Sequence, residues 1–307
     1  MSEKHIWVSG AAGFLGRRVV HHFHEAGWTV SGIEVAPLDP TDDLPVAQWY
    51  ERGVGEDALS GLAAHGLPDC IFHAAGGGTV GYSYDQPLQD FDLSVRATAQ
   101  MLDFLRLQAP DATFVLPSSA AVYGACPAEP LSENRTPAPL SPYGRHKLMA
   151  EHLCAQASDT FGLRTIAIRY FSLYGTNLRK QLLWDLGGKA LAAEGAVELF
   201  GTGEETRDMI QVEDAARLAL LLVGRQPEGR TLINGGSGRA LTVREIAAGL
   251  LEALGLDLDL RFNGVDRPGD PKHYRADVRA AASLGYRPEV SFAEGITEYA
   301  RWFRSVH

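Results

Sequence analysis

The opening of the chain constrains the fold more than any other part of it. A short apolar segment, KHIWVSG, runs into glycines at positions 10, 13 and 16. A segment with apolar residues at helical spacing follows, FLGRRVVHHFHEAG, and then a second apolar segment, WTVSGIE. The order strand, glycine-rich turn, helix and strand is that of a βαβ unit. We therefore expect the chain to begin with two parallel strands joined by a helix.

The same alternation continues through the first half of the chain. DCIFHAA, ATFVLPSS and LRTIAIRYF read as buried strands, and helices are expected over residues 87–107 and 141–161. Such alternation predicts a Rossmann-type α/β fold, with a doubly wound parallel sheet covered on both faces. We place this first domain at residues 1–175, with later segments able to return to it. Residues 176–307 are less regular, and they predict a smaller C-terminal lobe that closes over the sheet.

Composition excludes several classes of partner. The net charge of the 307 residues is -10, which argues against nucleic acid and against an anionic membrane surface. No segment approaches the roughly 20 apolar residues of a membrane span. The three cysteines, Cys70, Cys126 and Cys154, are scattered without a zinc-binding spacing. We expect a cytoplasmic protein with reduced thiols and no metal ion.

Gly10, Gly13 and Gly16 give the spacing GxxGxxG directly between a strand and a helix. Glycines at these positions permit a tight turn and bring a pyrophosphate close to backbone N–H groups at the start of the helix. A glycine-rich turn also occurs where a helix only packs closely on a strand, so the motif alone is weak. Its place after a strand favours dinucleotide binding.

Glu34 ends the second predicted strand. A carboxylate at this position accepts both hydroxyls of an adenosine ribose, and it would repel a 2′-phosphate. We therefore favour NAD over NADP. Arg17 and Arg18 are the counter-evidence, because an arginine near the turn is able to hold a 2′-phosphate. A solvated residue at a strand end is the simpler alternative for Glu34.

Tyr143 and Lys147 lie four residues apart and share one face of a predicted helix. A nearby ammonium stabilises a phenolate, so Lys147 is expected to lower the pKa of Tyr143 from about 10 toward neutrality. Such a tyrosine accepts a proton from a substrate hydroxyl while a hydride leaves the same carbon. Ser118 and Ser119 end a strand, where a hydroxyl would fix the substrate oxygen. The pair of Tyr143 and Lys147 alone is also compatible with an ordinary helix surface.

The ordered set of motifs resembles one family. GAAGFLG, HAAGG, SSAAVYG, SPYGRHK, RYFSLYG, GTGEETRDMIQVEDAA and RPGD are similar to those of the extended short-chain dehydrogenase/reductase superfamily, and most closely to its nucleotide-sugar epimerases and dehydratases, including UDP-glucose 4-epimerase. The resemblance implies an NAD-binding Rossmann domain and a lobe that binds a nucleotide sugar. It implies that Tyr143 is the base, that Lys147 is its partner and a ribose ligand, and that Ser119 is the hydroxyl anchor.

Further binding residues follow from the resemblance. Those expected to contact the cofactor are Gly10, Gly13, Phe14, Leu15, Gly16, Glu34, Ala74, Ala75, Gly76, Ser94, Tyr143, Lys147 and Tyr170. Those expected to contact the substrate are Ser119, Ser172, Arg207 and Arg267, the two arginines clamping its diphosphate. Ser94 and Ser172 stand where family members usually have asparagine, so we transfer no named sugar.

Two alanines separate the possible reactions. Dehydratases of the family carry an Asp-Glu pair after the active hydroxyl, where this chain has Ala120 and Ala121. Methyl groups neither remove a C5 proton nor protonate a leaving hydroxyl. We therefore predict an NAD-dependent 4-epimerase that acts by reversible hydride transfer through a 4-keto sugar. The alternatives are an NAD(P)H-dependent 4-keto nucleotide-sugar reductase and, less favoured, a non-catalytic dinucleotide-binding protein.

The resemblance also implies a homodimer in which helices 87–107 and 141–161 meet their counterparts. Other prominent side chains have plainer interpretations. We interpret His73, at a strand end, as a packing or loop-anchoring residue. His146 lies beside Lys147 but on another face of the helix. Trp184 is left open between the core and a pocket for the nucleotide base.

Overall fold

A computed structural model describes residues 4–41, 43–76, 78–226, 228–265 and 272–307 of the chain. The chain divides into two compact units. The first comprises the chain up to Gly124, Thr136–Tyr170 and Ala216–Ile233, and the second comprises Ala125–Arg135, Phe171–Ala215 and Asn234–His307. The chain thus leaves the first unit after Gly124 and again after Tyr170, and Ala216–Ile233 also belong to that unit.

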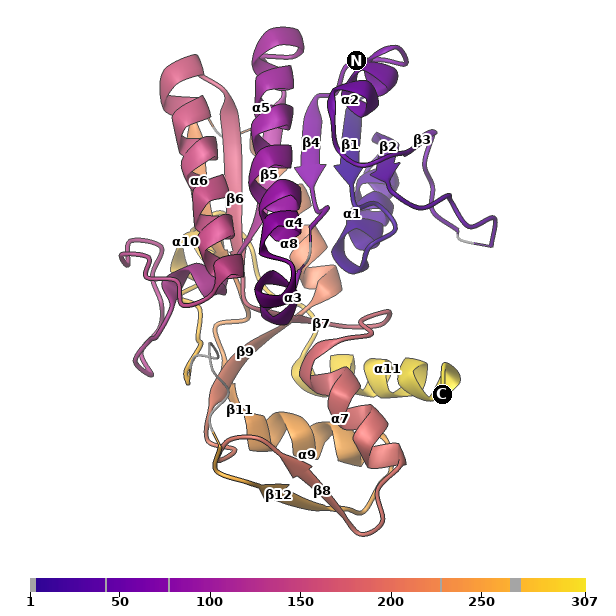
Figure 1. Cartoon of the computed structure of the whole chain (residues 1–307), viewed down its shortest axis with the longest axis vertical. Helices are drawn as coiled ribbons and strands as arrows, with labels where there is room; N and C mark the ends of the chain where they lie inside the picture. The colour runs from indigo at the N-terminus through magenta and orange to yellow at the C-terminus, as the bar shows by residue number, and fades with distance from the viewer. Residues whose placement is uncertain (1–3, 42, 77, 227, 266–271) are drawn as a thin grey trace. The chain divides into compact units, whose positions relative to one another are not determined.

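The first unit is built on a seven-stranded sheet (Figure 1). Its strands, in sheet order, are β10 (Arg230–Gly235), β6 (Arg164–Tyr170), β5 (Thr113–Ser119), β4 (Cys70–His73), β1 (His5–Ser9), β2 (Thr29–Glu34) and β3 (Gln48–Glu51). The pairings among β1 to β6 are parallel. The predicted doubly wound parallel sheet is confirmed.

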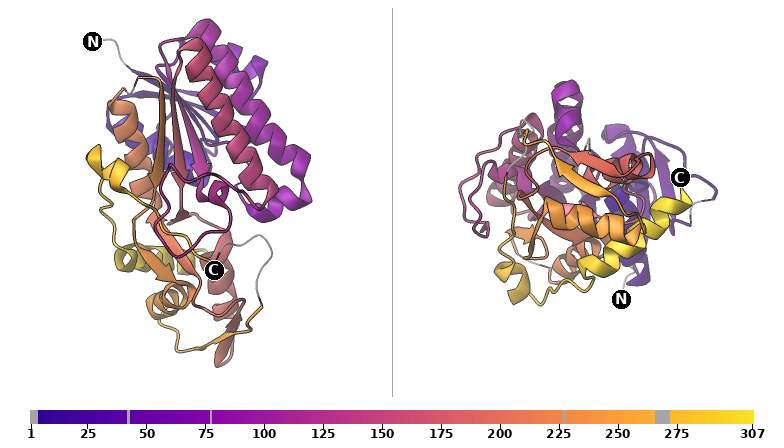
Figure 2. Two further views of the ribbon diagram at one scale, coloured as in Figure 1. Left: turned by 90° about the vertical axis from the view of Figure 1, so that its left-hand side faces the viewer. Right: turned by 90° about the horizontal axis from the view of Figure 1, so that it is seen from below.

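Helices cover both faces of this sheet (Figure 2). On one face, α2 (Glu56–Ala63), α5 (Ala97–Gln108) and α6 (Pro142–Phe161) bury a continuous apolar layer. Trp7 of β1, Phe114 of β5 and Met101 of α5 are fully buried in it. On the other face lie α1 (Phe14–Glu25) and α8 (Val212–Gly224). This arrangement explains why the strands are apolar on both sides.

The helix predicted over residues 87–107 is real but not uniform. It consists of α4 (Pro87–Phe91), a π-helical turn over Asp92–Arg96, and α5, and the short α3 (Val80–Asp85) precedes it. A π-helical turn inserts one extra residue into a helix, and it is often found at a functional site. The turn therefore separates a segment that packs on α3 from one that contributes apolar side chains to the core, and both segments contact α6.

The second unit contains two small sheets. β7 (Ser172–Tyr174), β9 (Thr206–Gln211) and β11 (Ala240–Thr242) form one, and β8 (Ala196–Leu199) and β12 (Asp259–Phe262) form the other. Four helices accompany them in the described residues: α7 (Gln181–Leu191), α9 (Val243–Ala253), α10 (Arg279–Ser283) and α11 (Phe292–Ser305). Tyr299 and Phe303 of α11 are fully buried in this unit.

A hydrogen bond joins the ends of β1 and β4, between which the strand order of the first unit reverses. The Ser9 hydroxyl lies 2.7 Å from His73 Nδ1 and accepts from the backbone N–H of Ala75 at 3.3 Å. His73 is almost fully buried. Burial and then the Lys147 ammonium lower the pKa of His73 to about 3, against a smaller opposing effect of the Leu93 backbone. His73 therefore anchors this edge of the sheet as a neutral imidazole.

We predict that Gly16→Ala destabilises the protein. A Cβ atom at Gly16 would lie 2.0 Å from the Gly10 carbonyl oxygen, and overpacking of this kind costs about 1–3 kcal/mol of the free energy of unfolding. Urea unfolding measures the loss. The control is Gly81→Ala in α3, where an added Cβ meets nothing within 4 Å. Equal stability of the two variants would contradict the packing argument.

We predict that His73 makes the protein sensitive to acid. The folded pKa of about 3 lies below the ordinary value of 6.5, so the unfolded chain binds the extra proton between these two pH values. The stability contributed by His73 is thus present above pH 6.5 and is lost as the pH falls toward 3. In His73→Asn, the free energy of unfolding should fall less steeply over this window. Parallel slopes for the variant and the natural chain would refute the assignment.

Candidate active site

The glycine turn lies between the ends of β1 and β4 and excludes side chains. Gly10 has a positive φ of 68°, and a Cβ there would lie 2.7 Å from the backbone nitrogen of Ala75. Gly16 is equally confined, by the carbonyl oxygen of Gly10. In open parallel sheets, ligands bind where the strand order reverses. The turn therefore stands at the expected cofactor position.

Helix α1 begins directly at this turn. Gly13 is its N-cap residue and supplies no capping side chain. The first N–H groups of a helix have no partner within the helix, so those of Phe14 and Leu15 are placed to bind phosphate oxygens. The partial positive charge of a helix start adds to this attraction.

The loop after β4 contributes the opposite wall. It contains Ala74, Ala75 and Gly76, and a Cβ on Gly76 would lie 4.0 Å from the Ser94 hydroxyl oxygen. Ser94 belongs to the π-helical turn, and its hydroxyl is buried without a hydrogen-bond partner among the described residues. A buried hydroxyl without a partner is costly unless a ligand satisfies it. This observation fits a polar cofactor group beside Gly76.

Glu34 ends β2, the neighbour of β1, and is half-buried. One of its carboxylate oxygens accepts the N–H of Val35 at 2.9 Å. A carboxylate at this strand end binds ribose hydroxyls. The glycine turn, the Glu34 carboxylate and the buried Ser94 hydroxyl all lie at the carboxyl ends of the strands or beside them. Together these groups suit the binding of NAD.

Tyr143 is placed by the start of α6. The Ser141 hydroxyl caps the helix by accepting from the backbone N–H of Gly144 at 3.1 Å. The backbone N–H of Tyr143 donates to the Ser83 hydroxyl of α3 at 2.9 Å. A Cβ on Gly144 would lie 2.7 Å from the carbonyl oxygen of Ala121. The glycine therefore lets the helix approach the end of β5, where Ser119 lies.

The two serines at the end of β5 have different roles. Ser118 is buried and donates to the carboxylate of Glu151 at 2.6 Å. Ser119 accepts from the backbone N–H of Ala121 at 3.1 Å and also hydrogen-bonds the Tyr143 side chain. The register pairs Ser119 with Tyr170 of β6. Geometry thus groups Ser119, Tyr143 and Tyr170 and leaves Ser118 in a structural role.

Lys147 does not act on Tyr143 as expected. Its ammonium donates to the Pro117 carbonyl at 3.0 Å and lies 5.9 Å from the centre of the Tyr143 ring. Burial raises the pKa of Tyr143 to about 12, the Ser119 hydrogen bond lowers it, and the Asp90 charge raises it. Burial lowers the pKa of Lys147 to about 8, while Asp90 and Glu151 raise it. The predicted shift of Tyr143 toward neutrality is therefore wrong for the protein groups alone.

Glu151 is a site residue that the motifs did not single out. It continues the stripe of Tyr143 and Lys147 along α6 at the same four-residue spacing, which is the signal that would have found it. Arg169 of β6 donates to both of its oxygens, at 2.9 and 2.7 Å, and both side chains are buried. Loss of one partner of such a pair costs about 3–5 kcal/mol. The pair fixes α6 against the sheet.

Two of the expected substrate residues, Ser172 and Arg207, lie in the second unit, whereas Ser119 lies in the first. Ser172 begins β7 and pairs with Met209 of β9. Arg207 lies two residues before Met209, so the two side chains share one face of the three-stranded sheet. The Arg207 guanidinium donates to the Thr206 carbonyl at 2.9 Å. Arg267 lies outside the described residues.

Trp184 proves to be a packing residue of the second unit. Its ring lies 5.2 Å from that of Phe303 and 4.7 Å from that of His307, between centroids. Arg179 stacks over it at 6.0 Å. Trp184 is half-buried, so it packs in this aromatic cluster while part of its side chain stays exposed.

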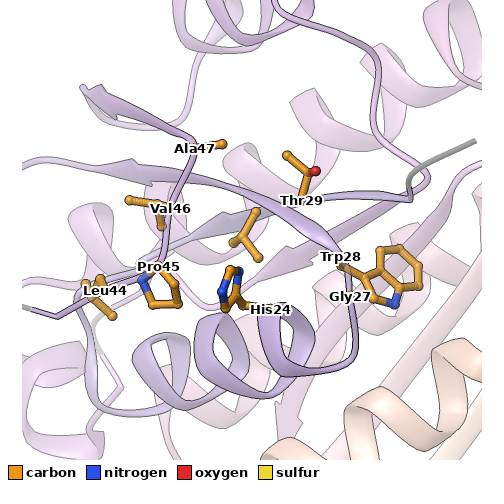
Figure 3. Close-up of a pocket in the computed structure, with 9 residues that line it drawn as sticks. His24, Gly27, Trp28, Thr29, Leu44, Pro45, Val46 and Ala47 are labelled. Atoms are coloured by element: carbon orange, nitrogen blue, oxygen red, sulfur yellow. The ribbon is translucent and has the colours of Figure 1, made fainter.

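A shallow cavity of about 440 Å³ lies elsewhere in the first unit (Figure 3). It is lined by the end of α1, the start of β2 and the chain before β3, including His24, Trp28 and Leu44. Because β2 starts here, the cavity lies at the amino ends of the strands, away from Ser119 and Tyr143. It is not the candidate active site.

The described residues contain neither a membrane-spanning helix nor a metal-binding cluster. None of the helices among them is both long and apolar enough to span a bilayer. No group of three or more His, Cys, Asp or Glu side chains in the same part of the chain is arranged to hold a metal ion.

Comparisons with known proteins identify the family of the chain. The model of the NAD-dependent epimerase/dehydratase family matches residues 6–235. A UDP-glucose 4-epimerase from Azospirillum brasilense is 31% identical over 98% of this chain and 92% of its own length. A dTDP-glucose 4,6-dehydratase from Streptomyces antibioticus is 32% identical over 97% of this chain and 91% of its own length.

The solved structures include a similar one with a bound cofactor. MoeE5 in complex with UDP-glucuronic acid and NAD is 29% identical, covers 98% of this chain and 99% of its own, and has a TM-score of 0.87. The predicted family and the NAD cofactor are thereby confirmed. The chain belongs to the NAD-dependent epimerase/dehydratase family.

Proposed function

We propose that this enzyme is an NAD-dependent UDP-sugar 4-epimerase. The observation that carries the proposal is the hydrogen bond between Ser119 and Tyr143 at the carboxyl edge of the sheet, next to two alanines instead of acids. Ser119, Tyr143 and Lys147 are the proposed catalytic residues. Similar proteins named UDP-glucose 4-epimerase support the substrate class.

In this mechanism Tyr143 moves the proton of the sugar C4 hydroxyl. Ser119 holds the C4 oxygen, and the Tyr143 phenolate takes its proton as the 4-keto sugar forms. The phenol returns the proton when the sugar is reduced on its other face. NAD, when bound, supplies the hydride acceptor and donor and a positively charged ring that favours the phenolate. Lys147 adds a buried cation on the same side of α6.

Dehydration is the competing chemistry, because a dTDP-glucose 4,6-dehydratase is among the similar proteins. Dehydration needs an acid or base beyond the tyrosine. Ala120 and Ala121 follow Ser119 in a short helical turn and carry only methyl groups. The buried carboxylates of Asp90 and Glu151 are engaged by His146 and by Arg169. This part of the site therefore favours epimerisation.

The substrate diphosphate is assigned to the second unit. We propose that Arg207 and Arg267 bind it, since a guanidinium fork matches phosphate oxygens. Ser172, on the same sheet face as Arg207, is proposed to contact the sugar. The proposed cofactor contacts are the same as those expected from the sequence: Gly10, Gly13, Phe14, Leu15, Gly16, Glu34, Ala74, Ala75, Gly76, Ser94, Tyr143, Lys147 and Tyr170.

We predict that Tyr143→Phe abolishes turnover while NAD binding persists. Loss of a positioned acid–base group lowers kcat by about 10²–10⁴-fold, and the phenyl ring keeps most of the packing. The measurements are steady-state turnover and the amount of NAD that copurifies. Tyr84→Phe, an exposed tyrosine of α3, is the control. Normal turnover by Tyr143→Phe would refute the assigned base.

The substrate panel decides among the three reactions. Purified protein is offered UDP-, dTDP-, GDP- and CDP-sugars without added cofactor, and products are identified by NMR. Appearance of the C4 epimer of a UDP-sugar is expected. Loss of water from the sugar would indicate a dehydratase. Reaction only with 4-keto sugars, at the expense of one NADH or NADPH per turnover, would indicate a reductase.

We predict a homodimer through α5 and α6. Leu107 of α5 is 58% exposed, and Met149 and Phe161 of α6 are 45% and 52% exposed. Burial of such side chains stabilises an interface. Leu107→Glu combined with Met149→Glu should halve the mass measured by light scattering, whereas Leu67→Glu, at an exposed site elsewhere, should not. A monomeric natural chain in dilute solution would contradict the dimer.

We also place the enzyme in the cytoplasm. Cys70 and Cys154 are buried, unpaired thiols, which are typical of a reducing compartment. Fractionation of cells that express the chain would test this placement.

A further inference from the structure

A buried acid and imidazole face each other beside the proposed catalytic tyrosine. Asp90 of α4 is fully buried, and its Oδ2 lies 2.5 Å from Nδ1 of His146 on α6. An ionised carboxylate only accepts, so His146 Nδ1 carries the hydrogen of this bond. The His146 side chain is only 13% exposed and meets the ring of Phe91 edge-on.

The carboxylate is incompletely satisfied. Asp90 Oδ1 is buried and has no hydrogen-bond partner among the described residues. Glu151, the other buried acid on this side, is met by the guanidinium of Arg169 through two hydrogen bonds. Asp90 is met by an imidazole alone. Its negative charge is therefore screened less than that of Glu151.

This charge acts on the catalytic side chains. After burial and the Ser119 hydrogen bond, the Asp90 charge is the next influence on Tyr143, and it raises the pKa of the phenol. For Lys147, Asp90 is the first group that opposes the effect of burial, and Glu151 is the second. Asp90 thus disfavours the phenolate and favours the ammonium.

Among the described residues, the titratable groups that surround Asp90 and His146 come from three elements. Tyr143 and Lys147 of α6 face Asp90, and Glu151 and the neutral His73 of β4 face Lys147. Asp92 and Arg96 of the π-helical turn pair with each other at the surface, at 2.7 Å. Within the described part of the chain, His146 is the hydrogen-bonding partner that holds Asp90 in place.

We propose that His146 and Asp90 are a positioning pair: His146 holds the Asp90 carboxylate and screens it through their hydrogen bond, and this sets the charge felt by the base Tyr143. The proposal rests on the proposed function, in which Tyr143 is that base. Without the His146 donor, the Asp90 carboxylate acts on the phenol unscreened. Without the carboxylate, His146 has no influence on Tyr143.

The test compares pH profiles of kcat/KM, whose acid limb reports deprotonation of the base in the free enzyme. Asp90→Asn should move the acid limb to lower pH, and His146→Leu should move it to higher pH, each by about one unit. The double variant should behave like Asp90→Asn. His146→Asn retains an N–H donor and should return the limb toward that of the natural chain.

A second readout needs no turnover. The ultraviolet titration of tyrosinate, taken as the difference between each variant and the same variant carrying Tyr143→Phe, should show the same opposite displacements. If His146→Leu fails to fold, Asp90→Asn alone still tests the proposal, because this variant must move the acid limb to lower pH.

The proposal is overturned if Asp90→Asn leaves the acid limb unmoved, or if the two single variants shift it in the same direction. It is also overturned if His146→Leu shifts the acid limb as much in the Asp90→Asn variant as it does in the natural chain. These results differ from a failure of the proposed function, in which Tyr143→Phe itself keeps its activity.

Discussion

The site depends on how α6 is held against the ends of β5 and β6. Contacts at two points along the helix matter most. Gly144 lets the helix backbone approach the Ala121 carbonyl, and two turns later Glu151 binds Arg169 and Ser118 inside the protein. Between these two contacts the helix cannot rotate without breaking one of them. Lys147 lies on the stretch so fixed and Tyr143 directly precedes it, which is why their side chains meet the Pro117 carbonyl and Ser119.

This anchoring also explains why the site is electrostatically unusual. A helix pressed onto the end of a sheet desolvates every polar group between them. The phenol and the ammonium consequently both have pKa values displaced toward their neutral forms. A site with this bias gains reactivity when a charged ligand enters, because a new charge acts strongly in a dry environment. The protein groups thus provide position, and a bound cofactor completes the electrostatics.

The order of the elements and the residues on strand ends and helix starts was predictable from sequence. The glycine turn, the serine pair at the end of β5 and the spacing of Tyr143 and Lys147 follow local rules, whereas the choice of Ser119 over Ser118 came from the family resemblance. The clamp of Glu151 by Arg169 and the pairing of Asp90 with His146 were not predictable, because each joins residues on different elements. His146 was expected on a face away from Lys147, yet nothing in the spacing indicated an acid on α4. The pKa of Tyr143 was misjudged because the spacing indicated Lys147 but not the burial around the phenol.

The π-helical turn over Asp92–Arg96 divides one long helix into two segments with different duties. Upstream, Asp90 is directed to α6; downstream, Met101 and Leu105 are directed to the core. Because one extra residue offsets the two segments by most of a third of a turn, Asp90 meets α6 while Met101 and Leu105 enter the core. Substitutions upstream are therefore able to retune the chemistry without repacking the core. The turn lets a single helix evolve as two independent parts.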